Sequence, residues 1–403
     1  VRAVCDNLDV TIRYNVISKE DEILIPGQSW TVDNRNSAAL SWVRDACQRQ
    51  EVPTMYLKPY ITMLADQNPY NPVVTWVTSA PWDGVSRLAE WFATVKERQG
   101  CRKLKEILMR KWAISAIRAA FEPFGSSAQG ILVFQGAQRK GKTRWIENLA
   151  PRDLDLVKSG LNLDLRSKDS IKMAISFWIG ELGELDATFK KSDISALKAF
   201  STNPYDVLRK PYAEAESKFP RRTVYAASVN DEKFLQDPTG NLRYWVIPIE
   251  TLDHSHAIDM QQFWAEVLEL YRAGEIHYLS DEELTDLDTH NEDFTVASPI
   301  EELVTTGLDW NDFNLSNCHW MSASDVLRWL GIKAPTRGES TDAGRALNHL
   351  NGGNKKKSNG VRLIPVPLRR VLVSEGAEMG NRVSQGTERV SEIEPYVPME
   401  IPF

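Results

Sequence analysis

Long apolar runs are absent from this 403-residue sequence, and none approaches the roughly 20 residues needed to cross a bilayer. The first residues, VRAVCDNLDV, also lack the basic stretch and apolar core of a signal peptide. Cysteine is scarce: the four residues at positions 5, 47, 101 and 318 form no C-x-x-C pair, and no histidines stand at metal-ligand spacing. These absences argue against a membrane protein, a disulfide-stabilised secreted domain and a zinc site, and they favour reduced thiols in a cytoplasm.

Positive charge is also in short supply. Lys and Arg number 48 against 55 Asp and Glu, which gives a formal net charge of -7. This charge argues against a protein coated in basic surface, but it does not exclude a motor that binds phosphates with a few positive groups inside a channel. Three local basic clusters remain, each either a nucleic-acid contact or a solvated charged surface: Arg209-Lys210, Lys218 with Arg221-Arg222, and Lys355-Lys356-Lys357.

The length allows two or three domains, and the pattern changes along the chain. Residues 1–120 are predicted to be mainly helical, with apolar residues at helical spacing in 37–50 and 102–121. Residues 121–255 alternate helical patterns with short apolar runs at 130–136, 175–182, 223–230 and 244–249. Near-continuous apolar runs are typical of buried parallel strands, so this section is predicted to be an α/β core.

The rest of the sequence is predicted to be a helical extension followed by a small domain. Residues 256–320 form the extension, which opens with a helix at 263–275. In 321–373, two short helices precede a basic turn and an apolar strand at 360–368, which is a winged-helix-like order. Residues 374–403 are expected to be a loosely ordered tail. The sequence begins with Val rather than Met, from which we expect a further domain upstream.

The strongest chemical signal is an octet that fits G-x-x-x-x-G-K-[ST], between an expected strand and an expected helix. Its glycines let backbone N–H groups face a phosphate, while Lys142 would reach the β- and γ-phosphates of ATP and Thr143 would hold Mg²⁺. The alternative is a glycine-rich turn with a surface lysine. The candidate nucleotide-binding residues are Gly136, Ala137, Gln138, Arg139, Lys140, Gly141, Lys142, Thr143 and, directly after the octet, Arg144.

Hydrolysis needs a carboxylate at the end of a neighbouring strand, to hold Mg²⁺ and to orient the attacking water. The segment ISFWIGELGELD places Glu181 at the C-terminal edge of an expected strand, where ligands of open α/β sheets bind. Glu181 is the first candidate for the acid and the Mg²⁺ ligand, and Glu184 is equally suited to polarise the water. The alternative is that these acids begin the next helix, where its dipole favours them.

Two further polar residues stand at the ends of apolar runs. Asn230 ends the run at 223–230 and is suited to bond the γ-phosphate or the water; alone, it is a turn former. Arg243 enters the last run, and ring ATPases place such an arginine on the neighbouring subunit's nucleotide. Arg209, Arg221 and Arg222 compete for that role, and the alternative for Arg243 is a cation–π pair with Tyr244 or Trp245.

The segment between the acid and Asn230, NPYDVLRKPYAEAESKFPRR, mixes basic and aromatic residues. Such a mixture suits a loop that touches a DNA backbone and stacks a base on an aromatic ring. The alternative is an exposed polar hairpin. The candidate DNA-contact residues here are Arg209, Lys210, Tyr212 and Lys218.

The order of these elements resembles the virulence-associated E family, whose ATPase domain is similar to superfamily 3 helicases and phage-type primase-helicases. The resemblance covers about residues 60–290 and rests on PVVTWVTSAPWDGVSR (72–87), the phosphate loop, GELGEL (180–185), ALKAFSTNPYDVLRKPY (196–212) and DPTGNLRYW (237–245). Two departures leave roles open: Leu242 stands where many members carry a second arginine, and the acid strand lacks paired adjacent acids.

The resemblance implies an AAA+-like ATPase core that works as a homo-oligomeric, usually hexameric, ring around nucleic acid, with a primase or polymerase domain upstream. By matching positions, it implies that Lys142 and Thr143 bind nucleotide and Mg²⁺, that Glu181 or Glu184 is the acid, that Asn230 is the sensor, that Arg243 is the arginine finger, and that Arg209-Lys210 face DNA.

The sequence therefore predicts an ATP-dependent helicase or translocase of single-stranded DNA, acting in phage or mobile-element replication in the cytoplasm of a bacterial host. The alternatives are a replication initiator without processive unwinding and a nucleotide-gated module of phage defence. In the winged-helix-like domain, Lys355, Lys356 and Lys357 are candidates for duplex contact, or else form a flexible basic loop on a packing domain.

Overall fold

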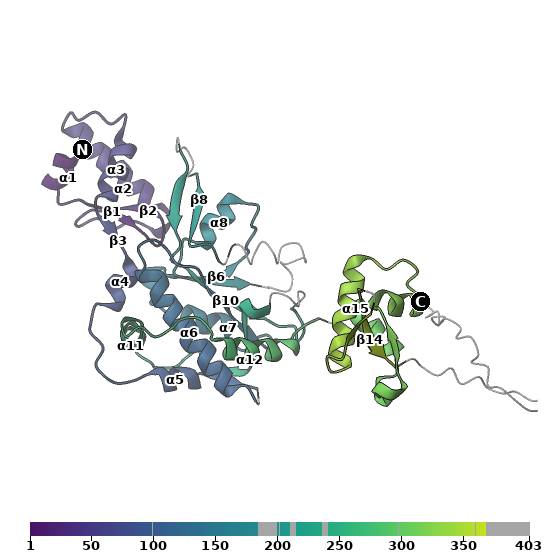
Figure 1. Cartoon of the computed structure of the whole chain (residues 1–403). Coiled ribbons are helices and arrows are strands. Elements are labelled where there is room, and N and C mark those ends of the chain that lie inside the picture. The colour runs from purple at the N-terminus through teal and green to yellow at the C-terminus, as the bar shows by residue number, and fades with distance from the viewer. Residues whose placement is uncertain are drawn as a thin grey trace, which may run out of the picture. The chain divides into compact units, whose positions relative to one another are not determined.

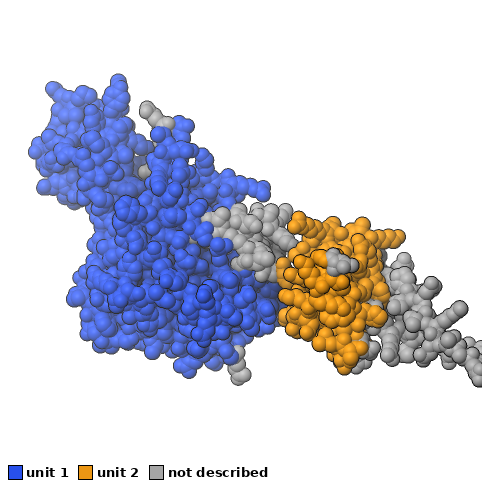
Figure 2. Space-filling view, in the orientation of Figure 1, with its two compact units in different colours: residues 1–295 blue, residues 296–403 orange. Residues whose placement is uncertain are grey.

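The computed structural model describes residues 1–98, 100–183, 200, 202–209, 215–235, 241–296, 298–358 and 360–367. The chain forms two compact units, the first spanning Val1–Thr295 and the second beginning at Val296 (Figure 2). The expected tail at 374–403 lies outside the described residues. Within the described residues, no helix is both long enough and apolar enough to cross a membrane.

A six-stranded sheet in the order β4-β11-β5-β10-β7-β6 forms the centre of the first unit. Every neighbouring pair is parallel except β4 and β11, so the chain is a mixed α/β protein with a parallel-rich sheet, as predicted. The strands are β4 (Val95–Glu97), β5 (Ile131–Gln135), β6 (Val157–Leu161), β7 (Ile179–Gly183), β10 (Val224–Val229) and β11 (Tyr244–Leu252).

Both faces of this sheet are covered, which is why its strands are apolar runs. All five residues of β5 are buried: Leu132 and Phe134 belong to one core and Ile131 and Val133 to the other. The first core is rich in tryptophan, with Trp178 and Trp264 at a ring distance of 4.6 Å. The helices that contribute to this core include α4 (Pro72–Val77), α5 (Leu88–Ala93), α6 (Arg102–Phe121), α7 (Lys142–Glu147) and α11 (Met260–Arg272) (Figure 1).

One strand boundary differs from the sequence prediction, while the acidic stretch within the expected helical extension forms a helix. The strand expected at 175–182 begins only at Ile179, because the indole of Trp178 turns to donate a 2.8 Å hydrogen bond to the carbonyl oxygen of Ala116 on α6. The acidic stretch at 281–293 is a helix, α12 (Asp281–Glu292), which begins with a capping box between Ser280 and Glu283. Acidic residues fill its first turn, where the helix dipole favours them.

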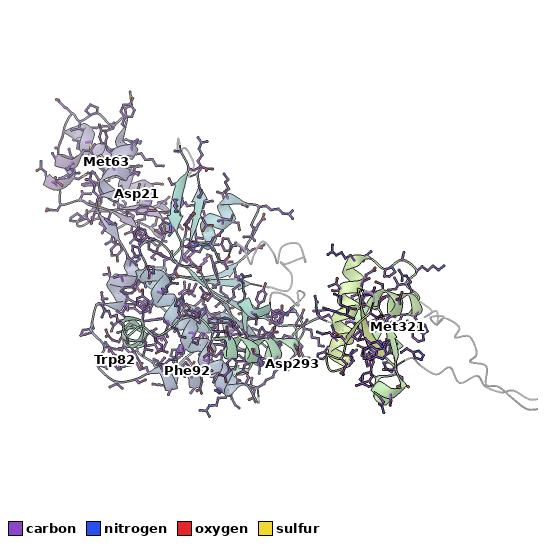
Figure 3. The ribbon with its side chains drawn as sticks, viewed as in Figure 1. Asp21, Met63, Trp82, Phe92, Asp293 and Met321 are labelled. Atoms are coloured by element: carbon purple, nitrogen blue, oxygen red, sulfur yellow. The ribbon has the colours of Figure 1, made fainter. Side chains whose placement is uncertain are left out.

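The segment that joins α4 to α5 is fixed by hydrogen bonds to α11. Trp82, labelled in Figure 3, donates from its indole nitrogen to the carbonyl oxygen of Val85 at 3.0 Å, and Arg87 pairs with Asp83 at 2.7 Å. The guanidinium of Arg87 lowers the pKa of Asp83 to about 2. The buried Glu266 of α11 accepts hydrogen bonds from the hydroxyl of Ser86 and the backbone N–H of Arg87.

The N-terminal part of the first unit adds a small sheet to the expected helices. The sheet has the order β2-β1-β3, and its core includes Val43, Cys47 and Ile61. The side chain of Lys19 is buried and donates to the carbonyl oxygen of Pro220 at 3.2 Å, which joins this part to the rest of the unit. Its elements are α1 (Arg2–Asn7), β1 (Thr11–Asn15), β2 (Glu20–Leu24), η1 (Val32–Asn34), α2 (Arg35–Arg49), α3 (Leu57–Asp66) and β3 (Pro69–Tyr70).

Between β7 and β10 the chain forms a two-stranded antiparallel hairpin, β8 (Tyr205–Leu208) with β9 (Ser217–Pro220). Leu208 and Phe219 of the hairpin are buried in the second core of the sheet. The remaining elements of this unit are η2 (Arg152–Leu154), α8 (Lys168–Ala174) and η3 (Asn241–Arg243).

The second unit packs helices on a three-stranded antiparallel sheet of order β12-β14-β13, around a core that includes Val326 and Leu347. Met321, labelled in Figure 3, packs against that core from β12. The elements in chain order are α13 (Pro299–Gly307), η4 (Trp310–Asp312), η5 (Leu315–Asn317), β12 (His319–Met321), α14 (Ala323–Trp329), α15 (Arg337–Leu350), β13 (Lys356–Ser358) and β14 (Val361–Val366).

Candidate functional site

The octet Gly136–Thr143 connects the C-terminal end of β5 to the start of α7. Gly136 donates its backbone N–H to the carbonyl oxygen of Val229 on β10 at 3.0 Å, which holds the loop against the neighbouring strand. Arg139 and Gly141 have positive φ angles of 63° and 80°, and Gly141 adopts this conformation without steric cost. Residues 137–140 are exposed, so the outer surface of the loop is accessible to a ligand.

Lys142 folds back into this loop rather than extending into solvent, and it is 7% exposed. Its ammonium group donates to the side-chain oxygen of Asn230 at 2.8 Å and to the carbonyl oxygens of Val229 and Ala137 at 3.1 and 3.2 Å. It also donates to the carbonyl oxygen of Gly136. The structure thus brings together the lysine of the octet and the asparagine that follows β10.

Glu181 lies in the middle of β7 rather than at its C-terminal edge as predicted, because the strand begins at Ile179 and continues to Gly183; 2% of its surface is exposed. One carboxylate oxygen, Oε1, accepts a hydrogen bond from the hydroxyl of Thr143 at 2.9 Å and another from the hydroxyl of Ser228 at 2.6 Å. Ser228 was not predicted from the sequence. The signal available was its position two residues before Asn230, on a strand that is otherwise apolar.

The oxygen atoms of Thr143 and Glu181 fit a magnesium ion, because Mg²⁺ prefers hard oxygen ligands and keeps several water molecules when phosphates share its coordination. Among the described residues, no group of three or more His, Cys, Asp or Glu side chains is arranged to hold a metal. A cation at this edge of the sheet would therefore depend on these two side chains together with phosphate oxygens.

The remaining catalytic candidates are placed differently. Glu184 lies outside the described residues. Arg243 is partly exposed and precedes β11, whose first residue Tyr244 pairs with Ile131, the first residue of β5. Since β5 and β11 are parallel, Arg243 and the phosphate loop stand at opposite ends of the sheet.

Two of the arginines considered for the same role are held in place by the fold. Arg221 is 0% exposed, forms a two-pronged ion pair with Asp206 on β8, and lies over the ring of Phe200. It is therefore inaccessible to a neighbouring subunit. Arg222 donates to the carbonyl oxygen of Pro123 at 2.9 Å, and burial lowers the pKa of its guanidinium.

The basic candidates for DNA contact fall on two exposed strand pairs. In the β8–β9 hairpin, Lys218 lies 3.5 Å from the ring centre of Tyr205, and Arg209 is exposed where β8 ends. Lys210 and Tyr212 lie outside the described residues. Tyr205 is 39% exposed and was not predicted as a contact residue.

In the second unit, the residues Lys355–Lys357 are exposed and lead into and along β13. Lys357 pairs with the exposed Arg362 of β14, and Lys356 lies 4.1 Å from the ring centre of Trp320. Arg362 therefore extends this basic surface, although the sequence did not single it out.

Comparison with known proteins agrees with this arrangement at the level of family. The model of the virulence-associated protein E-like domain matches residues 77–296, which is just over half of the chain. The chain belongs to this family. The match includes the octet, Glu181, Asn230 and Arg243. No curated protein matches the sequence.

Among solved structures, the chain is similar to the C-terminal region of NrS-1. One apo structure of that region is 11% identical with a TM-score of 0.43, over 91% of this chain and 98% of that chain. Two structures of its A form, also apo, score 0.43 at 11% identity over 90% and 98%, and 0.44 at 10% identity over 91% and 98%. Likeness at this level gives no basis for assigning an activity.

Proposed function

We propose that this protein is an ATPase of the phosphate-loop type that moves along or unwinds single-stranded DNA in phage or mobile-element replication. The observation that supports this proposal most strongly is a pair of side-chain hydrogen bonds, from Lys142 to Asn230 and from Thr143 to Glu181. These residues come from the loop after β5, from β7 and from the end of β10, and they meet near the C-terminal ends of parallel strands, where ligands of such sheets bind.

In this proposal, the octet and Arg144 bind the ATP phosphates, and the ammonium of Lys142 moves from its carbonyl partners to the β- and γ-phosphates. Thr143 and Glu181 would hold Mg²⁺, which neutralises charge on the phosphates when bound. Asn230 would bond the γ-phosphate or the attacking water. Its 2.8 Å hydrogen bond to Lys142 supports this role, because both side chains then face the same phosphate.

Arg243 supports a ring in which each site needs two subunits. From Ile131 to Gly136 the chain advances five residues, or about 16 Å in an extended strand, so Arg243 is too distant to reach the phosphates of its own subunit. A partly exposed arginine at that distance fits an arginine finger that acts on the neighbouring subunit of a homo-oligomer, expected to be a hexamer. The winged-helix-like assignment of the second unit and an AAA+-like core belong to the same proposal.

DNA contact is proposed for the β8–β9 hairpin and for the β13–β14 surface. The hairpin is inserted between the strand of Glu181 and the strand of Asn230, so movement at the nucleotide would be transmitted to it directly. Arg209 and Lys218 supply charge for a backbone, and the exposed ring of Tyr205 supplies a stacking surface.

The test is ATP hydrolysis by the purified chain with and without single-stranded DNA, beside the variants Lys142→Ala and Arg243→Ala. We expect DNA to raise turnover several-fold and each variant to be inactive alone. Mixing the two variants should restore part of the activity, because a Lys142→Ala subunit still offers its Arg243 to a neighbour whose phosphate loop is intact. Lys168→Ala, which removes an exposed lysine on α8, is the control and should match the wild type.

Hydrolysis that ignores DNA would contradict the translocase proposal and favour a nucleotide-gated module. If Arg243→Ala hydrolyses ATP normally, or if mixing restores nothing, the two-subunit site is wrong. Strand-displacement assays then separate a helicase from an initiator that remodels DNA without processive unwinding.

A further inference from the structure

The turn after β11 lies against the phosphate loop, a contact that no sequence pattern predicted. A Cβ atom at Gly141 would collide with the imidazole of His254 and lie 3.3 Å from its Nε2. The carbonyl oxygen of His254 accepts a 2.6 Å hydrogen bond from the side chain of Asn148, just after α7. His254 therefore contacts both ends of α7: its imidazole lies beside Gly141 at the start, and its carbonyl oxygen bonds Asn148 at the end.

The turn itself is held in one conformation. Asp253 accepts hydrogen bonds at 3.0 Å from the backbone N–H and the hydroxyl of Ser255, and its own N–H donates to the carbonyl oxygen of Thr94 at 2.8 Å. The imidazole of His254 remains partly exposed. A rigid turn therefore presents a partly accessible aromatic ring beside the octet.

The strand order gives the direction in which a nucleotide would lie. Glu181 lies on β7 and Asn230 directly follows β10; both strands are on one side of β5, whereas β11 is on the other side. In the proposed function, the γ-phosphate and Mg²⁺ face Glu181 and Asn230. The nucleoside end must then leave the loop in the opposite direction, toward the end of β11 and His254.

We propose that His254 contacts the nucleoside part of the bound nucleotide and forms the wall of the site on the β11 side. This inference rests on the proposed ATPase function and adds to it a binding residue that acts on the ribose and base rather than on the phosphates. Stacking of a base on an aromatic side chain changes affinity by roughly five- to a hundredfold, so the contact is large enough to measure.

The experiment compares two probes, MgATP and magnesium tripolyphosphate, which carries the phosphates without a nucleoside. Binding of each is measured by calorimetry for the wild type and the variants His254→Ala, Lys142→Ala and His319→Ala. His319 is an exposed histidine of the second unit and controls for the loss of an imidazole. We expect His254→Ala to weaken MgATP about tenfold and to leave tripolyphosphate unchanged, while Lys142→Ala weakens both and His319→Ala weakens neither.

The two probes distinguish the possible failures. If His254→Ala binds MgATP like the wild type, or if it weakens both probes equally, His254 does not contact the nucleoside and the inference is wrong. Unchanged tripolyphosphate binding shows that the variant is folded around an intact phosphate loop. If the wild type binds neither probe, the ATPase proposal itself fails, and this inference falls with it.

Discussion

The buried ion pair between Arg221 and Asp206 offers a test of the fold that does not depend on any proposed activity. Arg221 donates to both carboxylate oxygens of Asp206, each at 2.8 Å, and to the carbonyl oxygen of Phe200. The side chains are 0% and 11% exposed. Asp206→Ala would leave the guanidinium buried without its counter-ion, and such a loss costs about 3–5 kcal/mol.

Urea unfolding followed by tryptophan fluorescence measures this cost, because Trp145, Trp178 and Trp264 are buried in the same unit. Glu216→Ala is the matched control: Glu216 pairs with Lys168 at 3.7 Å, but the two side chains are 57% and 66% exposed. An exposed pair contributes about 0–1 kcal/mol, so the control should unfold almost like the wild type.

A double variant tests whether the cost comes from leaving Arg221 without its counter-ion. Asp206→Leu with Arg221→Met replaces both charges by apolar groups, and such replacements of buried pairs are often close to neutral. The double variant should therefore be more stable than Asp206→Ala alone. If Asp206→Ala loses less than about 1 kcal/mol, Arg221 has access to water, and the hairpin is not anchored as the structure describes.

Three further predictions concern the site and the second unit. Glu181→Gln should keep ATP binding but lower hydrolysis about 10²–10⁴-fold, measured by single-turnover kinetics; equal loss of binding would contradict a role in the chemical step. Replacing Lys355–Lys357 by alanine should make the plot of log affinity for duplex DNA against log salt concentration less steep by about 2–3. An unchanged slope would show that these lysines do not contact DNA phosphates. Burial and the nearby Arg118 lower the pKa of His277 to about 4. Between about pH 6.5 and pH 4 the unfolded chain therefore binds a proton that the folded chain does not, and the free energy of unfolding should fall as the pH drops through this range. In urea unfolding, His277→Gln should show a smaller fall over the same range.

Local patterns were sufficient to predict the strand that leads into the octet and the long helix that packs against the same sheet. The apolar run at 130–136 corresponds to β5, and the helical pattern at 102–121 coincides with α6. Each signal lies within one continuous segment: an apolar run needs no knowledge of its partner, and Pro123 stands just beyond the end of α6. The glycines and lysine of the octet are likewise adjacent in sequence.

Contacts between strands that are far apart in sequence could not be predicted from local patterns. In the small sheet, β1 pairs with β3, so Asn15 lies opposite Tyr70 across more than fifty residues. Neither β1 (TIRYN) nor β2 (EDEIL) is a continuous apolar run, and β2 does not alternate apolar and polar residues, so this pair of segments gives no clear strand signal. His254 and Gly141 are separated still further, and only the parallel pairing of β11 with β5 brings them together.

The position of Glu181 on β7 distinguishes it from an acid that merely begins a helix. Along β7, Ile179 and Glu181 share a face, and Ile179 belongs to an otherwise apolar core. A carboxylate buried on such a face is costly unless it has partners. Among the described residues, its hydrogen-bond partners are the neutral hydroxyls of Thr143 and Ser228, and no basic side chain forms an ion pair with it. In the proposed function, a magnesium ion bound beside Thr143 supplies the positive charge that two hydroxyls cannot, and we propose this as the reason for the burial of Glu181.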